Sequence, residues 1–498
     1  MALPVESIKR SAHGPGIDRA ACHLTANNMK WTQAATVSTL LGAARALPQG
    51  WQHHGGPPGW PDPSGPPPVH PPAEYVQNVT VFSPPANWPS KSGSYARSVL
   101  LNQDCETGIP TLLATAAYNP PDGQYFEIFK STDYGASWSS FSKAYFDGNA
   151  SLTGGIILQP FLYELAEPFG EYGPGTVLLS GNRIPGDFSS TNIQLYASKD
   201  KGSSWEYIST VAYGGLPNTT NGAPCVWEPF ILAYENQLNV FYSDQRDPNY
   251  GQKLAYQSSQ NLEAWGPVVN AVAYSNYTQR PGMITMAQIG NGSWMCSYEV
   301  GLWTDARGSN EGAPYATHYK ISDSPLTFGE VGDHLLRTEY GADSSAGPYT
   351  IWTPAGGPNG TIVVSDSTYD QLFLNTQNGE PGFWQNVTSD HGVGYTRQLR
   401  VLPGNGGKTV MVLNGGMYGQ KVTEFTVGDY IVPGPDGQGP VSSMYAGNLR
   451  TDSLTIVIGC RGIPKLQAEG AGAWMGALVV STMQIANKYS FCYTRIFQ

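Results

Sequence analysis

The sequence predicts an all-β protein, a six-bladed β-propeller, and three observations lead to this fold. Aromatic residues make up 12% of the 498 residues and charged residues only 13%, with 59 Gly and 39 Pro. This composition is typical of sheet proteins with many turns and not of helical bundles. Short β-type runs such as Thr361–Val364 alternate with turn clusters along most of the chain. A turn motif also recurs at a spacing that fits one four-stranded sheet per repeat.

The recurring motif has the pattern Ser-x-Asp-x-Gly-x-x-Trp, the Asp box. Full copies begin at Ser131 and Ser198, and a shortened, degenerate copy begins at Ser259, so successive copies start 67 and 61 residues apart. In a hairpin turn the Asp caps backbone N–H groups, the Gly accepts a positive φ and the Trp packs into the blade. A body of about 350 residues divided by about 60 residues per repeat predicts six blades. We interpret the boxes as structural and not catalytic.

Composition divides the chain into five segments. Residues 1–28 are interpreted as an upstream extension, and residues 29–46, which begin Met29-Lys30 and end Ala44-Arg45-Ala46, have the layout of a secretory signal peptide. The alternative for 29–46 is a short amphipathic helix in a linker. Residues 47–74 form a Pro/Gly/His-rich linker, residues 75–427 the propeller, and residues 428–498 a poorly ordered or aberrant tail.

Glycosylation sequons point to the same compartment as the signal layout. Seven Asn-x-Ser/Thr sequons all lie within the propeller segment: Asn78, Asn149, Asn218, Asn276, Asn291, Asn359 and Asn386. The sequence therefore predicts a secreted, extracellular glycoprotein.

The propeller segment contains three cysteines, Cys105, Cys225 and Cys296. Whether two of them form a disulfide stays open, because the partners cannot be read from the sequence.

Charge and hydropathy exclude several partners. The net charge of −11 disfavours nucleic acid, and no apolar run reaches the roughly 20 residues that a membrane span needs. His318, His334 and His391 lack metal-ligand spacing, so we expect no metal and no cofactor.

Two glutamates are candidates for glycosidic bond hydrolysis, which needs a pair of carboxyl groups. Glu228 lies in Trp227-Glu228-Pro229-Phe230 at the start of a strand, and Glu299 ends the apolar run that begins at Trp294. A glutamate at a strand end is more often a solvated loop residue. Both, however, lie among aromatic residues, where desolvation would raise the pKa of a carboxyl group toward the range of an acid/base catalyst.

The ordered set of motifs resembles the fungal exo-1,5-α-L-arabinanases of glycoside hydrolase family 93, which have a sialidase-like six-bladed propeller. The resemblance covers about residues 75–427 and is carried by Ser94–Ser98, Trp227–Phe230, Tyr242–Pro248, Gly251–Leu254, Arg280–Met283, Ser297–Glu299 and Asn414–Gly416. It implies a retaining hydrolase that releases arabinobiose, or arabinose, from the non-reducing end of linear α-1,5-L-arabinan. It places the two catalytic glutamates on Glu228 and Glu299; we favour Glu228 as nucleophile and Glu299 as acid/base over the reverse.

The resemblance also implies partners and further site residues. The partners would be plant cell-wall arabinan or pectin side-chain oligosaccharides, and we expect a monomer. Four charged residues in the motifs either line the funnel or form structural ion pairs: Arg97, Asp244, Arg246 and Arg280. Three aromatic residues are either sugar-stacking platforms or blade core: Trp227, Tyr298 and Trp303.

Two other functions compete with this reading. A sialidase-like exoglycosidase acting on another glycan would need an arginine triad and an Arg-Ile-Pro motif before the first Asp box, whereas Arg183-Ile184-Pro185 follows that box. A non-catalytic sugar-binding propeller would have the same fold without the carboxylate chemistry.

For each of these functions we expect residues near Tyr75–Phe82 to pair with the last strands of the propeller near Thr409–Leu413, because a closed propeller must cover both sheet edges.

Overall fold

The computed structural model describes residues 76–88, 90–102, 110–302, 315–417, 420–421 and 423–434. The expected upstream extension, signal peptide and linker lie outside the described residues, as do Trp303, Cys105 and nearly all of the expected tail.

The described chain forms six four-stranded antiparallel sheets, numbered here as blades I to VI. Blade I contains β2 (Arg97–Leu101), β3 (Thr111–Thr115), β4 (Tyr125–Ser131) and β5 (Ser139–Tyr145). Blade II contains β6 (Ile156–Glu164), β7 (Val177–Ile184), β8 (Thr191–Ser198) and β9 (Glu206–Gly214). Blade III contains β10 (Val226–Tyr234), β11 (Gln237–Asp244), β12 (Lys253–Ser259) and β13 (Val269–Val272). Blade IV contains β14 (Gln279–Gln288), β15 (Trp294–Leu302), β16 (Ala316–Ser322) and β17 (His334–Leu335). Blade V contains β18 (Thr350–Thr353), β19 (Thr361–Ser365), β20 (Gln371–Asn375) and β21 (Gln385–Thr388). Blade VI contains β22 (Gln398–Val401), β23 (Thr409–Asn414), β24 (Phe425–Ile431) and β1 (Val79–Phe82).

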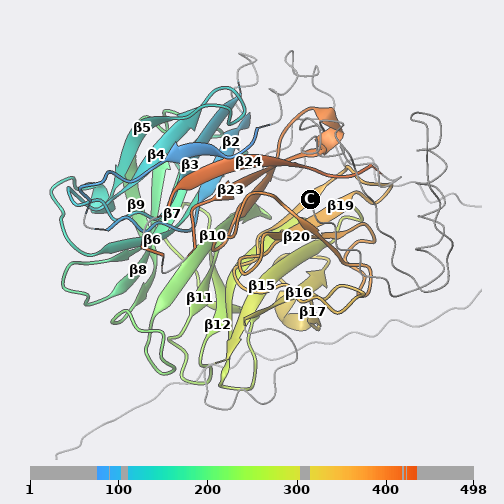
Figure 1. Cartoon of the computed structure of the whole chain (residues 1–498). Coiled ribbons are helices and arrows are strands. Elements are labelled where there is room, and N and C mark those ends of the chain that lie inside the picture. The colour runs from blue at the N-terminus through green and yellow to red at the C-terminus, as the bar shows by residue number, and fades with distance from the viewer. Residues whose placement is uncertain are drawn as a thin grey trace, which may run out of the picture.

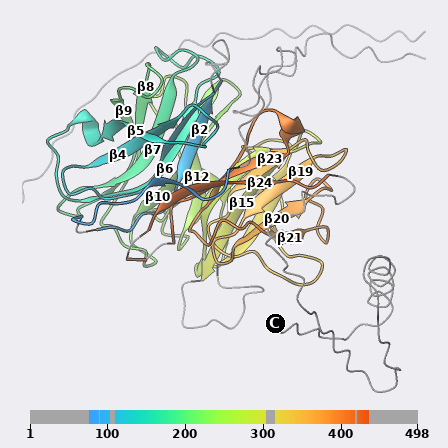
Figure 2. The ribbon, with the colours of Figure 1, turned by 45° about the horizontal axis from the view of Figure 1, so that its top comes forward.

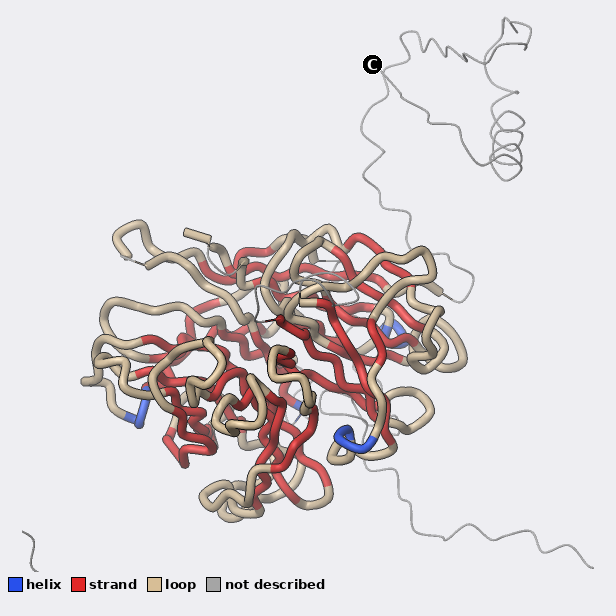
Figure 3. The backbone as a smooth tube through the Cα atoms, turned by 90° about the horizontal axis from the view of Figure 1, so that it is seen from below, coloured by secondary structure: helices blue, strands red, loops and turns tan. Residues whose placement is uncertain are grey.

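The innermost strands of the six blades contact one another in a closed cycle, in the order β2, β6, β10, β14, β18, β22 and back to β2. Figures 1 and 2 show the sheets arranged around this cycle. The predicted six-bladed β-propeller is therefore confirmed. Besides strands and loops, the described residues contain three short 3-10 segments at Phe146–Gly148, Phe328–Glu330 and Asn405–Gly407 (Figure 3). None of the described helices is long and apolar enough to cross a membrane.

The Asp boxes form the turns between the third and fourth strands of blades I to III. In the first box Asp133 accepts hydrogen bonds from the backbone N–H and the hydroxyl of Ser137, and Gly135 has a φ of 92°. In the degenerate third box Asn261 takes the place of the Asp and accepts the N–H of Ala264. The turn is therefore kept although its signature residue is replaced.

The box tryptophans join neighbouring blades. The indole N–H of Trp205 in blade II donates to Ser142 in blade I at 3.1 Å. The indole N–H of Trp265 in blade III donates to Ser209 in blade II at 3.0 Å. These side chains therefore help to fix the angle between blades as well as the turn that carries them.

Blade VI closes the ring with strands from both ends of the propeller segment. β1 pairs with β24, and β24 pairs with β23, so Val79–Phe82 and Thr409–Asn414 share one blade as expected, with β24 between them. Figure 1 shows β24 and β23, in orange-red, beside the blue strand β2. The expected boundary at residue 427 falls inside β24, which continues to Ile431. The sequence analysis ended the propeller too early because the polar Gly428–Tyr430 stretch hides the strand.

The described cysteines do not form a disulfide. Cys225 and Cys296 are buried free thiols. The thiol of Cys225 donates to the carbonyl oxygen of Leu216, which ties the β9–β10 loop to the strand that carries Glu228.

The closure makes a prediction about where the chain can be cut. A chain that ends at residue 427 loses the pairing of Gly428–Ile431 with β23 and the two hydrogen bonds between Asp429 and the backbone of Val76. At roughly 1 kcal/mol per lost hydrogen bond, we expect it to be less stable than a chain that ends at residue 434 by about 3 kcal/mol or more. Urea unfolding of the two chains measures the difference. Equal midpoints would contradict the role assigned to β24.

Candidate active site

Each blade places one residue with a positive φ at or just before its innermost strand. In order from blade I to blade VI these residues are Tyr95, Gln159, Glu228, Met283, Ala346 and Thr396. In blades II, III and IV the position coincides with a β-bulge, where the register to the second strand shifts. Such a conformation costs a non-glycine residue about 1–3 kcal/mol and redirects its side chain. Tyr95, Gln159, Glu228 and Met283 all line one pocket on the propeller axis.

The bulge of blade III repeats that of blade II in sequence. Gln159-Pro160-Phe161 and Glu228-Pro229-Phe230 stand 69 residues apart, and the side-chain oxygen of Gln159 accepts the N–H of Glu228 at 2.9 Å. The amide of Gln159 in turn donates to the hydroxyl of Tyr95. Gln159 is absent from the predicted site residues, although this internal Pro-Phe repeat is a sequence signal that could have found it.

Glu228 reaches across from blade III to blade IV. Its Oε2 accepts the backbone N–H of Met283 at 2.9 Å and the hydroxyl of Ser243 at 2.6 Å. The side chain is half-buried and reaches Gly282, where an added Cβ would lie 3.2 Å from Oε2. A glycine at this position therefore leaves room for the carboxyl group.

Glu299 approaches the same point from the next strand. It lies on β15, where its register partner on β14 is Gly282. Its Oε2 accepts the N–H of Gly347 at 2.6 Å, and its Oε1 accepts the hydroxyl of Tyr395 at 3.0 Å. The two predicted glutamates are thus brought together on either side of Gly282, and their supports come from blades III to VI.

The two carboxyl groups have unequal surroundings. The pKa of Glu299 is raised to about 7, first by burial and then by the negative charge of Glu228. Burial also raises the pKa of Glu228, but its two hydrogen bonds and the positive charges of Arg280 and Arg97 oppose that shift. Of the two groups, Glu299 is therefore the one favoured to hold a proton.

The pocket at Glu228 ends at a pair of phenylalanines. Phe161 and Phe230 line this pocket, with ring centroids 4.6 Å apart, and also line a second cavity of ≈ 130 Å³ formed by the later residues of the inner strands. The aromatic pair thus stands between two spaces on the propeller axis. The pocket at Glu228 lies toward the first residues of the inner strands, on the side of the loops that enter them.

Two predicted arginines lie in the wall of the site. Arg97 is 4% exposed, donates to the carbonyl oxygen of Thr396 at 2.8 Å and lies over the ring of Tyr349. Arg280 donates to the carbonyl oxygen of Gly251 at 3.0 Å and to other side-chain oxygens. Both arginines also attract the charge of Glu228. They are positioned to tune that carboxylate.

Asp244 and Arg246 form a structural ion pair instead of lining the pocket. Both carboxylate oxygens of Asp244 accept from the guanidinium of Arg246 at 2.9 Å. The same guanidinium packs over Tyr242 and donates to the carbonyl oxygen of Tyr213. Asp244 is only 2% exposed. Of the two roles that the sequence left open for these residues, the structure contains the ion pair, which holds the end of β11.

Two of the predicted sugar-stacking aromatics are core residues. Tyr298 is fully buried and its hydroxyl contacts that of Tyr274. Trp227 is 9% exposed, and its indole N–H donates to Gln245 at 2.7 Å. Trp227 packs in a core cluster with Ile184 and Cys225 and does not line the pocket at Glu228. Neither ring offers a face to a sugar. Trp303 lies outside the described residues.

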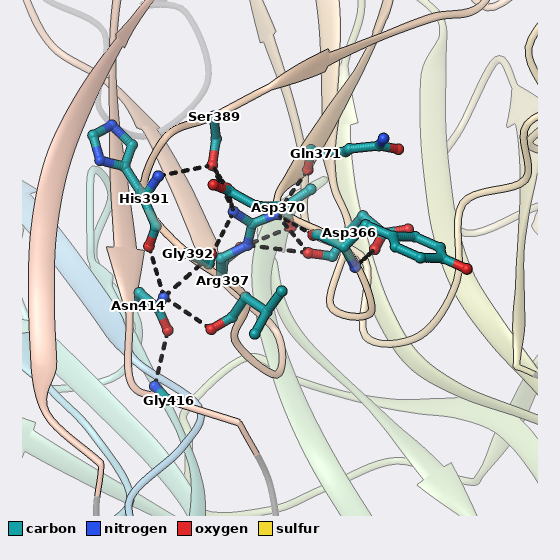
Figure 4. A network of polar contacts seen from close by, with 12 residues as sticks. Asp366, Asp370, Gln371, Ser389, His391, Gly392, Arg397, Asn414 and Gly416 are labelled. Carbon is teal, nitrogen blue, oxygen red and sulfur yellow. Dashed lines mark hydrogen bonds and ion pairs between the residues drawn. The ribbon is translucent and has the colours of Figure 1, made fainter. Parts of the chain in front are cut away.

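A buried polar network holds the loop that delivers Tyr395 (Figure 4). Arg397 donates to Asp370 at 2.9 Å and to backbone oxygens that include those of Asp366 and Gly392. Asn414 donates to the carbonyl oxygen of His391 and accepts the N–H of Gly416. The Asn414–Gly416 motif therefore fixes the β21–β22 loop around residues 391–397, and through it the hydroxyl that contacts Glu299. Sequence reasoning did not identify Tyr395, because its partner is 96 residues away.

No group of three or more His, Cys, Asp or Glu side chains with the geometry of a metal site occurs within the described ranges.

Comparisons with known proteins were made by sequence and by structure. Neither a protein-family profile nor a curated protein sequence matches this chain. Solved structures do. The α-L-arabinanase of Penicillium chrysogenum, in complex with arabinobiose, is 37% identical with a TM-score of 0.66; the match covers 72% of this chain and 98% of that chain. The family 93 α-L-arabinofuranosidase of Fusarium graminearum, also with arabinobiose, is 35% identical, with the same TM-score and coverage.

The chain belongs to glycoside hydrolase family 93. It is a glycoside hydrolase, and the family suggested by the sequence motifs is confirmed. A further structure of the Fusarium enzyme holds an iminosugar inhibitor, at 35% identity. These family 93 structures match this chain over nearly their whole length, so the resemblance covers the complete propeller and not one motif.

The effect of the Glu228 charge on Glu299 predicts a coupled titration. In a Glu228→Gln variant we expect the pKa of Glu299 to fall below about 7, because a like charge is removed. It will stay above the ordinary value, because burial remains. Carboxyl carbon NMR on protein labelled at the glutamate Cδ measures this, with Glu299→Gln assigning the signal. The exposed Glu263 is the control, since Glu263→Gln leaves Glu299 unchanged. An unshifted titration in Glu228→Gln would show that the two groups do not interact.

Proposed function

We propose that this protein is a secreted, retaining hydrolase that releases arabinobiose from the non-reducing end of linear α-1,5-L-arabinan. The observation that carries the proposal is the pair formed by Glu228 and Glu299, held by hydrogen-bond donors from four blades, within a family 93 propeller. The family members from Penicillium and Fusarium were solved with arabinobiose. Arabinan in plant cell walls and on pectin side chains is the substrate we infer, and a monomer is the state we expect.

The unequal environments support distinct roles for the two carboxyl groups. Glu228, next to two arginines and two hydrogen-bond donors, is suited to be the ionised nucleophile that forms a bond to the anomeric carbon. Glu299, with its raised pKa, is suited to give its proton to the departing glycosidic oxygen. In the second step the ionised Glu299 takes a proton from water, and the water oxygen replaces Glu228 on the anomeric carbon. Two such displacements retain the anomeric configuration.

The aromatic pair supports action at a chain end. An enzyme that cuts within a polymer needs a groove open at both ends, whereas here the rings of Phe161 and Phe230 lie between the pocket at Glu228 and the cavity beyond it. We infer that a chain terminus stops at these rings, and that their distance from the carboxyl pair sets the length of the product. Arabinobiose, the ligand of both relatives, is the length we propose.

The alternatives are less well supported. A sialidase-like site would need arginines free to bind a substrate carboxylate, but Arg97 and Arg280 already donate to protein carbonyl oxygens and Arg397 is completely buried. A non-catalytic sugar-binding propeller would have no use for one buried and one half-buried carboxyl group, since withdrawing these groups from water is unfavourable.

Hydrolysis of linear arabinan by three variants tests the proposal. Glu228→Gln and Glu299→Gln are each expected to lower kcat by several orders of magnitude with a small effect on KM, because each group acts in the transition state. Glu339→Gln, which changes an exposed carboxylate on the same face, is the control and keeps activity. Product analysis of the wild-type reaction identifies arabinobiose or arabinose. Wild-type activity in the double variant would refute the assignment.

Azide separates the two roles. With an activated aryl substrate, azide is expected to rescue Glu228→Ala with an inverted product and Glu299→Ala with a retained product. The opposite pattern would exchange the nucleophile and the acid/base.

Secretion makes a separate prediction about glycans. Five of the seven sequon asparagines are exposed, whereas Asn359 is half-buried and its Nδ2, the attachment atom, donates to the carbonyl oxygen of Thr376. We expect a mature N-terminus after Ala46 and glycans at exposed sites such as Asn276, with the lowest occupancy at Asn359. Mass spectrometry of the protein secreted by a fungal host, before and after enzymatic deglycosylation, measures both. An intracellular, unglycosylated product would contradict secretion.

A further inference from the structure

Exposed apolar side chains gather on the face that holds the carboxyl pair. Because the strands in each blade are antiparallel, the loops entering an inner strand and the loops joining its second and third strands lie on one face. Among the described residues twelve large hydrophobic side chains are exposed, and eight of them lie on this face. Five of the eight are tyrosines: Tyr213, Tyr277, Tyr315, Tyr340 and Tyr369. Such concentrations commonly mark binding surfaces.

Tyr277 is the member of this group that connects to the pocket. Its carbonyl oxygen accepts the side-chain amide of Asn221 at 2.9 Å, and Asn221 in turn accepts from Arg280. Arg280 is close enough to Glu228 to influence its charge. Hydrogen bonds therefore link Arg280, whose charge acts on Glu228, to the backbone of Tyr277, which is 39% exposed.

The β9–β10 loop continues the surface beside Tyr277. A Cβ added to Gly222 in this loop would lie 3.7 Å from the Tyr277 hydroxyl oxygen. The same loop carries Leu216, which is 64% exposed, and begins after Tyr213, which is 63% exposed. Neither side chain is covered by another part of the described chain. We call Tyr277, Leu216 and Tyr213 the rim platform.

We propose that the rim platform holds the arabinan chain beyond the sugars seated in the pocket. This inference rests on the proposed function and extends it. The rings of Phe161 and Phe230 separate the pocket from the cavity formed by the later residues of the inner strands, so we expect the rest of a polymer to leave across the face that carries the platform. A sugar ring presents apolar C–H groups on its face and hydroxyls at its edge. A half-exposed tyrosine offers a matching apolar face and polar tip.

The platform predicts a difference between long and short substrates. Tyr277→Ala is expected to lower kcat/KM on linear arabinan by about 2- to 10-fold, the range of a single aromatic contact, mainly by raising KM. The same variant is expected to leave arabinotriose hydrolysis unchanged, because a trisaccharide ends before the platform. Tyr277→Phe keeps the ring and is expected to behave as wild type on both substrates. Leu216→Ser removes a second part of the platform and is expected to lower only the polymer reaction.

Phe383→Ala is the matched control. Phe383 is 57% exposed but lies in the loop between β20 and β21, on the opposite face, so its removal is expected to change neither reaction. All variants retain the Asn276 sequon and are made in one host, so that glycosylation is constant, and thermal unfolding checks that each is folded.

Three results would overturn the inference. An equal loss on polymer and arabinotriose would show that Tyr277 acts on the catalytic site through Arg280. If neither Tyr277→Ala nor Leu216→Ser lowers activity on either substrate, the surface does not bind the polymer. It would then be a binding surface for a partner protein. Wild-type protein inactive on both substrates would refute the proposed function together with the platform, whereas the first two results leave the function standing.

Discussion

The pairing of β1 with β24 is the constraint on which the rest of the structure depends. It joins Val79–Phe82 to Phe425–Val427 and so closes the ring of six sheets. The candidate site needs a closed ring, because Glu228, Glu299, Gly347 and Tyr395 come from blades III, IV, V and VI. An unpaired edge would let the blades separate and leave strand edges open to other chains. The same closure brings the inner strands of neighbouring blades close together. A backbone N–H of one blade can then donate a hydrogen bond to a glutamate carboxylate of the blade beside it.

The site is built from features that are individually unfavourable. Six residues with positive φ surround the axis, at a cost of about 1–3 kcal/mol each, and two carboxyl groups are withdrawn from water. The raised pKa of Glu299 means that the folded state holds a proton which the unfolded chain releases. This group therefore opposes folding increasingly as the pH rises from about 4.5 to about 7. Packing between blades, including the bonds from Trp205 and Trp265, offsets these costs. A strained, desolvated pocket supported by a rigid ring is well suited to catalysis.

Several residues, most of them from the motifs, support the site without lining its pocket. Asp244 and Arg246 bind each other at the end of β11. Asn414 and Arg397 fix the loop that carries Tyr395. Their side chains do not line the pocket, yet each holds the backbone that places a group there. Motifs read along the chain therefore mark the scaffold of this site as well as its reacting groups.

The sequence alone determined the fold class, the blade repeat and the two glutamates, because these depend on local patterns: turn chemistry in the Asp boxes, alternating strands, and carboxyl groups beside aromatic residues. It also contained the repeated Pro-Phe bulge at Gln159 and Glu228, which was overlooked. Only the tertiary structure decided which residues face the pocket. Alternation along the strand places Trp227 and Glu228 on opposite sides, but only the packing of the blades decides that Glu228 lines the pocket and Trp227 lies in the core. Tyr395 and Gly347 reach Glu299 only after the ring has closed. Contacts between blades depend on register and closure, and these are properties of the whole ring that no short stretch of sequence specifies.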